Sequence, residues 1–306
     1  MPSERRSKMG AGWIRWQVEV APEAEEVAAE GLRALGAAGT EHQGSPDGAV
    51  RVVAYFPAER APSPEHDFAH LQERLAASGL QPWPARLHQE AVDDEDWAER
   101  WKEHFPPMQI GRLWIRPSWE AGEPPPGTQT LVLDPGLAFG TGTHPTTRLC
   151  LKGLQRYLAS GDVVADVGTG SGILAMGAAL LGARRVVAVD VDPIAVRVAR
   201  ENVERNRLQW AVTVLEGSTE VAERAVRAVQ PGGAQLVVAN LLTSILVELA
   251  PTLVPILAPG GVLLASGIAA GQEGAVEAAF REVGLEVAGR ELEEAWVLVV
   301  ARRPRG

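Results

Sequence analysis

Residues 163–192 have the sequence VVADVGTGSGILAMGAALLGARRVVAVDVD, and this stretch decides the fold of the chain. A short β-branched apolar run at 163–167 is typical of a buried parallel strand. Glycines alternate with small polar residues at 168–172, and an apolar helix is expected over 173–181. A second apolar run at 185–190 ends in an aspartate. Strand, glycine turn, helix and strand together predict one right-handed βαβ unit.

Such a unit offers a site for one kind of ligand. Glycines at a strand end let the backbone approach a ligand closely, because no Cβ intervenes. The helix that begins there presents unpaired N–H groups and the positive end of its dipole. Asp190, at the end of the second strand, can accept hydrogen bonds from both hydroxyls of a ribose. We therefore expect an adenosine-containing cofactor at the carboxyl edge of the sheet.

The glycine spacing indicates which cofactor this is. A dinucleotide site has the pattern Gly-x-Gly-x-x-Gly, whereas Gly168, Gly170 and Gly172 are evenly spaced. Asp166 would repel a pyrophosphate but not a cofactor that carries an ammonium group. The pattern Asp-x-Gly-x-Gly-x-Gly resembles motif I of the class I S-adenosylmethionine-dependent methyltransferases. That resemblance implies S-adenosylmethionine, with NAD(P) or a βαβ unit without a ligand as the alternatives.

Composition restricts the partners and the compartment. The formal charge of −10 and the pI of about 5.2 give no reason to expect direct binding to nucleic acid or to an anionic membrane. The sequence has no 18-residue apolar run, and because no apolar segment follows its basic first residues we expect no signal peptide. Cys150 is the only cysteine, which excludes an internal disulfide and favours a reducing compartment. We expect a cytoplasmic protein that acts as a monomer, and we expect Cys150 to be buried.

The first part of the chain predicts a small separate domain. Its alternating and helical apolar patterns give the order β-α-β-β-α-β over residues 10–92, which suggests a ferredoxin-like α+β fold. The expected elements are a strand at 12–20, a helix at 22–35, strands at 37–43 and 49–56, a helix at 64–79 and a strand at 82–90. Nothing in this domain resembles a catalytic site, so we interpret it as a substrate-recognition domain. His66 and His70 resemble the zinc motif His-Glu-x-x-His, but no third ligand is evident and we expect no metal site.

Residues 93–119 are expected to connect the two domains. Trp97, Trp101 and Phe105 recur every four residues and so share one face of a predicted helix, followed by a strand at 113–115. We expect this aromatic face to pack between the two domains. The alternative is that its aromatic side chains form a cage around a ligand.

A second informative stretch precedes the βαβ unit. Residues 131–150, LVLDPGLAFGTGTHPTTRLC, predict a strand that ends at an aspartate, a glycine-rich loop and a helix that begins near Pro145. Glycine-rich loops in this position usually contact or cover ligands, and Phe139 could pack on the cofactor. Thr147 lies in the first helical turn, where its hydroxyl can meet a polar end of the cofactor. His144 is either a general base or the cap of the helix.

The remaining elements complete a seven-stranded Rossmann-like α/β sheet with a terminal antiparallel pair, which we assign to a catalytic domain at 120–306. They are helices at 193–207, 219–229, 243–257 and 271–283, and strands at 212–216, 236–239, 261–266, 285–289 and 296–302. Asn240 directly follows the strand expected at 236–239.

The motifs DPGLAFGTGTHPTT, DVGTGSGILA, VDVDP and VVANLL, in this order, resemble the bacterial methyltransferases that modify large-subunit ribosomal protein eleven. The resemblance extends upstream to DWAERWKEHFPPMQIGRLWIRPSW and the N-terminal domain. It implies methylation of lysine side-chain and N-terminal amines of that ribosomal protein, which the N-terminal domain grips. It also implies that Thr147, Gly168, Asp190 and Asn240 contact the cofactor. Another lysine methyltransferase substrate, such as the electron-transfer flavoprotein, is the alternative.

The expected mechanism is in-line displacement of a methyl group from a sulfonium by a neutral amine. Alignment of the reactants is the main contribution that the protein makes. Since the sequence offers no obvious base, we expect Asn240 to orient the amine and solvent to take the proton. A small-molecule methyltransferase, a nicotinamide oxidoreductase and a non-catalytic binding protein are the other classes considered.

Overall fold

The computed structural model describes residues 13–37, 39–44, 49–58, 61–77, 86–92, 106–134 and 144–305. The chain divides into two compact units, residues 1–105 and 106–306, and each is described by itself. The predicted helix with Trp97, Trp101 and Phe105, and the predicted loop with Phe139, lie outside the described residues.

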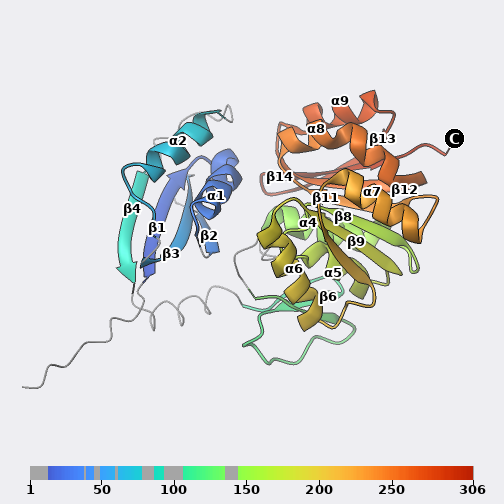
Figure 1. Cartoon of the computed structure of the whole chain (residues 1–306), viewed down its shortest axis with the longest axis horizontal. Coiled ribbons are helices and arrows are strands. Elements are labelled where there is room, and N and C mark those ends of the chain that lie inside the picture. The colour runs from blue at the N-terminus through green and yellow to red at the C-terminus, as the bar shows by residue number, and fades with distance from the viewer. Residues whose placement is uncertain are drawn as a thin grey trace, which may run out of the picture. The chain divides into compact units, whose positions relative to one another are not determined.

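The N-terminal unit has a four-stranded antiparallel sheet with two helices (Figure 1). Its strand order is β2-β3-β1-β4. Alternation in β1 turns Trp16 and Val18 to the helix side, where Trp16 meets Phe56 edge-on with ring centroids 5.3 Å apart. Both helices contribute to this one core, through Leu32 and Leu71 among others. The elements are β1 (Trp13–Val20), η1 (Pro22–Ala24), α1 (Glu25–Ala34), β2 (Gly39–Gly44), β3 (Val50–Pro57), α2 (Asp67–Ala77) and β4 (Arg86–Val92).

The second unit is built on a seven-stranded sheet in the order β10-β9-β8-β11-β12-β14-β13. The first five of these are mutually parallel, and β14 runs antiparallel to both of its neighbours. The predicted sheet with its terminal antiparallel pair is therefore confirmed. The strands are β8 (Val163–Val167), β9 (Arg185–Asp190), β10 (Val212–Glu216), β11 (Ala234–Asn240), β12 (Leu257–Ala269), β13 (Glu286–Glu293) and β14 (Trp296–Arg302).

Helices cover both faces of this sheet, as Figure 1 shows. One apolar cluster joins a strand face to α4, α5 and α6, and a second joins the opposite face to α7, α8 and α9. Strands buried on both faces need continuous apolar sequence, which explains the Val-Val-Ala runs of β8 and β9. Cys150 is fully buried in the first cluster, as predicted, and burial raises the pKa of its thiol. The helices are α4 (Pro145–Tyr157), α5 (Ile173–Leu180), α6 (Pro193–Arg205), α7 (Thr219–Val229), α8 (Thr243–Leu253), η3 (Val254–Ile256) and α9 (Glu273–Glu282).

A small three-stranded sheet accompanies the large one. It contains β5 (Met108–Ile110), β6 (Leu113–Arg116) and β7 (Gln129–Val132), in that order. The sequence did not predict β5, because three residues after two prolines carry no periodic signal. The strand predicted at 113–115 is β6, which pairs in parallel with β7 and so lies in the second unit rather than in a connecting segment.

Across the described part of the chain, no helix combines the length and the apolarity that crossing a membrane requires.

Gly267, in β12, allows a close approach of the backbone at Leu241, directly after β11. Its φ is +86°, and a Cβ there would lie 2.3 Å from the carbonyl oxygen of Leu241. We expect Gly267→Ala to lower the free energy of unfolding by about 2 kcal/mol or more, because both the strained φ and a backbone clash must be accommodated. Thermal unfolding followed by circular dichroism measures this effect.

Gly274→Ala is the matched control, since a Cβ at this exposed position in α9 meets nothing within 4 Å. It should leave the free energy of unfolding unchanged or raise it by up to about 1 kcal/mol. Equal melting temperatures for the two variants would contradict the assignment of strain to Gly267.

Candidate functional site

Three of the four predicted cofactor residues lie at one edge of the large sheet. β8 pairs with β9 on one side and with β11 on the other, so the strand order reverses beside β8. Val167, the last residue of β8, is in register with Val189 and Ala239. The residues that follow these three are Gly168, Asp190 and Asn240. Ligands of open α/β sheets bind in the crevice at such a reversal, outside the carboxyl ends of the strands.

The glycine loop has the conformation that its sequence predicts. Gly168, Gly170 and Gly172 have φ of +74°, +54° and +84°, which side chains with a Cβ rarely adopt. The N–H groups of Gly168 and Thr169 both donate to the Val189 carbonyl oxygen at 2.9 Å, and this ties the loop to β9. The loop then leads directly into α5, whose first N–H groups face the same edge.

The Asp190 carboxylate lies against this loop. Its Oδ2 accepts the N–H of Gly170 at 2.9 Å, and its Oδ1 accepts the N–H of Asp192 at 3.0 Å. The residue is half-buried. A carboxylate has about four acceptor positions, so two backbone donors hold it in place and leave capacity for ribose hydroxyls.

Asp166 is part of the loop's support. It is fully buried, and its Oδ2 accepts the Thr169 hydroxyl at 2.7 Å and the Ala175 N–H at 3.0 Å. Among the described residues, Oδ1 has no hydrogen-bond partner. Burial raises the pKa of this carboxyl to about 7, although the two hydrogen bonds act in the opposite direction. The buried Asp166 side chain therefore stabilises the glycine loop through hydrogen bonds and is not a solvent-exposed carboxylate.

Helix α4 begins at the same edge. Trp296 pairs with Ala269 at the end of β12, and the His144 ring meets the Trp296 ring edge-on at 4.9 Å. His144 is the N-cap, because its Nδ1 accepts the Thr146 N–H at 3.3 Å. Of the two roles that the sequence allowed for His144, the structure supports the cap.

Thr147 has a property that suits a ligand contact. The residue is fully buried in the first turn of α4, yet its hydroxyl has no hydrogen-bond partner in the part of the chain that the structure describes. A buried hydroxyl without a partner costs about 1–3 kcal/mol. A polar group of a bound cofactor would remove that cost.

Asn240 has a fixed backbone and an available amide. It is in register with Ser266, and the next residue, Leu241, donates its N–H to the Ser266 carbonyl oxygen at 2.9 Å. Gly267, the next residue of β12, also lies against the backbone of Leu241. No hydrogen bond joins the half-buried Asn240 side chain to another described residue. The amide can therefore turn toward a ligand without losing a protein contact.

Sequence reasoning did not identify two further features of this edge. Val191, directly after Asp190, exposes 70% of its surface, and Ile194 exposes 46%. Thr219, in the first turn of α7, is fully buried with an unpartnered hydroxyl among the described residues. The available signal for Val191 was an apolar residue directly after Asp190, the acid predicted to bind the ribose. Nothing local in the sequence marks Thr219.

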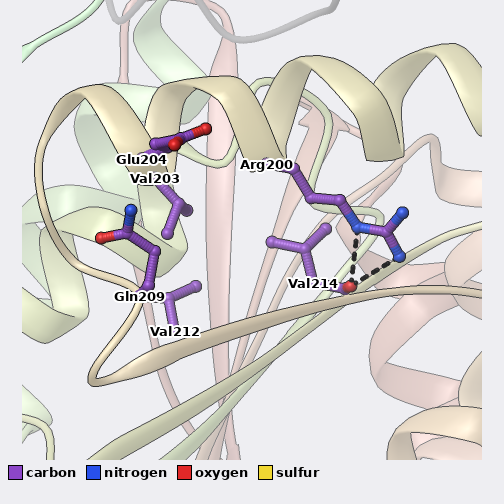
Figure 2. Close-up of a pocket in the computed structure, with 6 residues that line it drawn as sticks. All are labelled: Arg200, Val203, Glu204, Gln209, Val212 and Val214. Atoms are coloured by element: carbon purple, nitrogen blue, oxygen red, sulfur yellow. Dashed lines mark hydrogen bonds between the residues drawn. The ribbon is translucent and has the colours of Figure 1, made fainter.

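A shallow cavity of about 350 Å³ lies elsewhere, between α6 and β10 (Figure 2). None of the four predicted cofactor residues lines it, so we do not assign the cofactor to it. Its walls are Arg200, Val203, Glu204, Gln209, Val212 and Val214.

The described residues contain no cluster of three or more side chains able to hold a metal ion. In the zinc-like motif, the exposed His70 ring faces Glu73 at 3.2 Å on α2.

Comparison with known proteins identifies the family. The family model described as Ribosomal protein L11 methyltransferase (PrmA) matches residues 12–304. The chain belongs to this family. A ribosomal protein L11 methyltransferase from Chloroflexus aurantiacus is 41% identical over 96% of this chain and 98% of its own length. The one from Pelotomaculum thermopropionicum is 44% identical over 84% of this chain and 80% of its own.

A solved structure supports the same assignment. The crystal structure of a ribosomal protein L11 methylase from Lactobacillus delbrueckii subsp. bulgaricus is 33% identical, with a TM-score of 0.57. It covers 65% of this chain and 98% of its own. The predicted membership of the L11 methyltransferase family is therefore confirmed, while the roles of Thr147, Gly168, Asp190 and Asn240 stay predictions.

The raised pKa of Asp166 leads to a stability prediction. The folded chain keeps a proton on this carboxyl up to about pH 7, whereas an unfolded aspartate loses it near pH 4. Folding therefore takes up a proton in this window, and the Asp166 contribution to stability falls as pH rises from about 4 to 7. Asp166→Asn keeps an acceptor for Thr169 and Ala175 and does not ionise.

We compare the unfolding free energy of Asp166→Asn with that of the original chain. As pH rises from about 4.5 to 8, we expect this difference to increase in favour of the variant by on the order of 2–4 kcal/mol. Urea unfolding of both proteins without cofactor measures this difference. Because both proteins share all other titrating groups, the contributions of those groups cancel in it. A difference that does not change with pH would show that Asp166 is ionised in the folded chain.

Proposed function

We propose that this chain methylates lysine side-chain and N-terminal amines of ribosomal protein L11, with the reaction at the carboxyl edge formed by Gly168, Asp190 and Asn240. As a member of its family, it is an S-adenosylmethionine-dependent methyltransferase that acts on L11. The observation that carries the proposal for the site is the combination of a glycine loop with two available polar groups. These are the unpartnered buried hydroxyl of Thr147 and the amide of Asn240.

The residues present fit S-adenosylmethionine. The glycine loop admits the ligand next to its backbone, and Asp190 has acceptor capacity for the ribose hydroxyls. Thr147 and Asn240 offer polar contacts to the amino-acid end of the cofactor. When bound, the cofactor supplies an electrophilic methyl group on a sulfonium.

Asn240 has a second role in this proposal. A free lysine amine has a pKa of about 10.4, so it must lose a proton before its lone pair can attack. The Asn240 Oδ1 accepts a hydrogen bond from the neutral amine and aims the lone pair, while solvent takes the proton. Ser266, Gly267 and Leu241 fix the Asn240 backbone, so only the side-chain torsions have to be set when the amide meets the amine. Such alignment is a major source of rate in reactions between two bound groups.

The N-terminal unit is, in this proposal, a ferredoxin-like recognition domain for L11 that reorients against the catalytic domain. Its described elements run β-α-β-β-α-β, which supports the assignment. The sheet face opposite the helices carries paired charges, Arg15 with Glu90 and Arg51 with Glu19. The net charge of −10 suits a basic protein substrate. We further propose a cytoplasmic monomer without direct contact to nucleic acid.

Mass spectrometry of unmodified L11 incubated with the chain and S-adenosylmethionine tests the substrate. We expect mass gains in steps of one methyl group, and fragment spectra should place them on lysine side chains and the N-terminal amine. Reactions without the cofactor, and with Asp190→Ala, are the controls. If L11 stays unmodified and a different basic protein is methylated, the proposal that L11 is the substrate is wrong.

Asn240→Ala tests the role of the amide. We expect kcat to fall by about 10²-fold, because the amine loses the acceptor that orients it. Steady-state methylation of L11 at saturating cofactor measures this change. Gln272→Ala removes an exposed amide at the start of α9 and should leave kcat unchanged. Full turnover by Asn240→Ala would remove Asn240 from the mechanism.

A further inference from the structure

We propose that Asn202 and Arg205 in the last turn of α6, and Asn206 at its C-cap, are positioning residues that hold the glycine loop and the end of β7 in fixed relation for cofactor binding. None of the three belongs to the predicted cofactor contacts. The inference rests on the cofactor site named in the proposed function; its activity part also rests on the proposed substrate L11, whereas its binding part does not.

Asn202 fixes the glycine loop from behind. The residue is only 3% exposed, and its Nδ2 donates to the Ser171 carbonyl oxygen at 2.9 Å. Ser171 lies between Gly170 and Gly172, both with positive φ, so no regular helix or strand pairing is available to its carbonyl group. The buried carbonyl needs a donor, and the amide supplies one 31 positions away in the chain. The position of the loop therefore depends on the position of Asn202.

Asn206 holds β7 in the same way. Its Oδ1 accepts the N–H of Val132 at 2.8 Å, and its Nδ2 donates to the carbonyl oxygen of Val132 at 2.7 Å. One side chain thus replaces a neighbouring strand at the last residue of β7. The same Nδ2 lies 3.4 Å from the sulfur of Met176 in α5, the helix that follows the glycine loop.

Arg205 joins these two anchor points. Its Nη1 donates to the Asn202 Oδ1 at 2.8 Å and lies 3.5 Å from the Asp134 carboxylate. The other carboxylate oxygen of Asp134 accepts the Ser118 N–H at 2.6 Å. Contacts therefore run without interruption from the loop carbonyl through Asn202 and Arg205 to the segment after β7. That segment leads along the chain to α4 and Thr147.

Helix α6 is itself held at its start and near its middle, so it can serve as a support. At its start, the Asp192 carboxylate accepts the Ile194 N–H at 2.8 Å, two residues after Asp190. Figure 2 shows Arg200 reaching β10, where Nε and Nη2 donate to the Val214 carbonyl oxygen at 3.2 and 3.0 Å. Functional groups need supporting residues that are themselves fixed. α6 supplies this support to Asp190, the glycine loop and β7 together.

The test is calorimetric binding of S-adenosylhomocysteine to the full chain carrying Asn202→Asp. Aspartate has the shape of asparagine and still accepts from Arg205, but it lacks the donor to the Ser171 carbonyl oxygen and places a negative charge beside it. We expect affinity to fall at least 10-fold. In methylation assays the KM for S-adenosylmethionine should rise, while kcat at saturating cofactor changes less than 3-fold.

Val226→Ala separates positioning from general stability. Val226 is fully buried in α7 on the opposite face of the sheet, so its truncation lowers the melting temperature without touching the α6 network. We expect less than a 2-fold change in affinity for this control. Equal affinity losses in Asn202→Asp and Val226→Ala at matched distance from their melting temperatures would overturn the proposal.

Arg205→Met is the second variant, chosen because this side chain is 39% exposed and its loss is less disruptive to folding. It removes both the donor to Asn202 and the ion pair with Asp134, and we expect a 3- to 10-fold loss of affinity. An unchanged affinity in a folded Arg205→Met would overturn the connection to Asp134. Because binding is measured without L11, a failure of the proposed substrate would leave these outcomes unaffected.

Discussion

Two hydrogen bonds to one carbonyl group determine how this site is built. The N–H groups of Gly168 and Thr169 both point to the Val189 oxygen, so the chain leaving β8 turns across the end of β9. This turn brings the Gly170 N–H to the Asp190 carboxylate and orients α5 toward the sheet edge. It requires positive φ at Gly168, where a Cβ would lie 2.4 Å from the Leu241 side chain. The conformation of Gly168, the end of β9 at Val189 and the position of the Asp190 carboxylate therefore depend on one another.

The edge concentrates buried polar groups, which ordinary cores exclude. Asp166, Thr147, Ser171 and Asn202 are each less than 5% exposed, and all lie at or beside the site. Buried polar groups reduce stability unless their hydrogen bonds are complete. The network around Asn202 is complete, whereas Thr147 and the Oδ1 of Asp166 have no partner among the described residues. Buried polar groups without a protein partner at this edge are available to pair with a bound ligand.

Local sequence predicted the parts of the fold that local physics controls. Strands β8 and β10 and helix α7 have the predicted boundaries, because β-branched runs, glycines and amphipathic spacing act within a few residues. The three-residue strand β5 had no such pattern. The strand predicted at 261–266 extends as β12 from Leu257 to Ala269, since its ends are fixed by pairing with β11 and β14. Asn206 contacts Val132 from 74 positions away, and no rule of helix spacing reveals that partner.

The large sheet is open, and its two outer strands differ in how they are protected. An outer strand leaves backbone groups that can pair with another chain and start aggregation. On β10, the Val214 carbonyl oxygen already accepts two hydrogen bonds from Arg200, so an incoming strand would have to displace a guanidinium group. On β13, Glu286, Arg290, Glu291 and Glu293 place charged side chains along the strand. Each outer strand of the sheet therefore carries side chains that oppose pairing with a strand of another molecule.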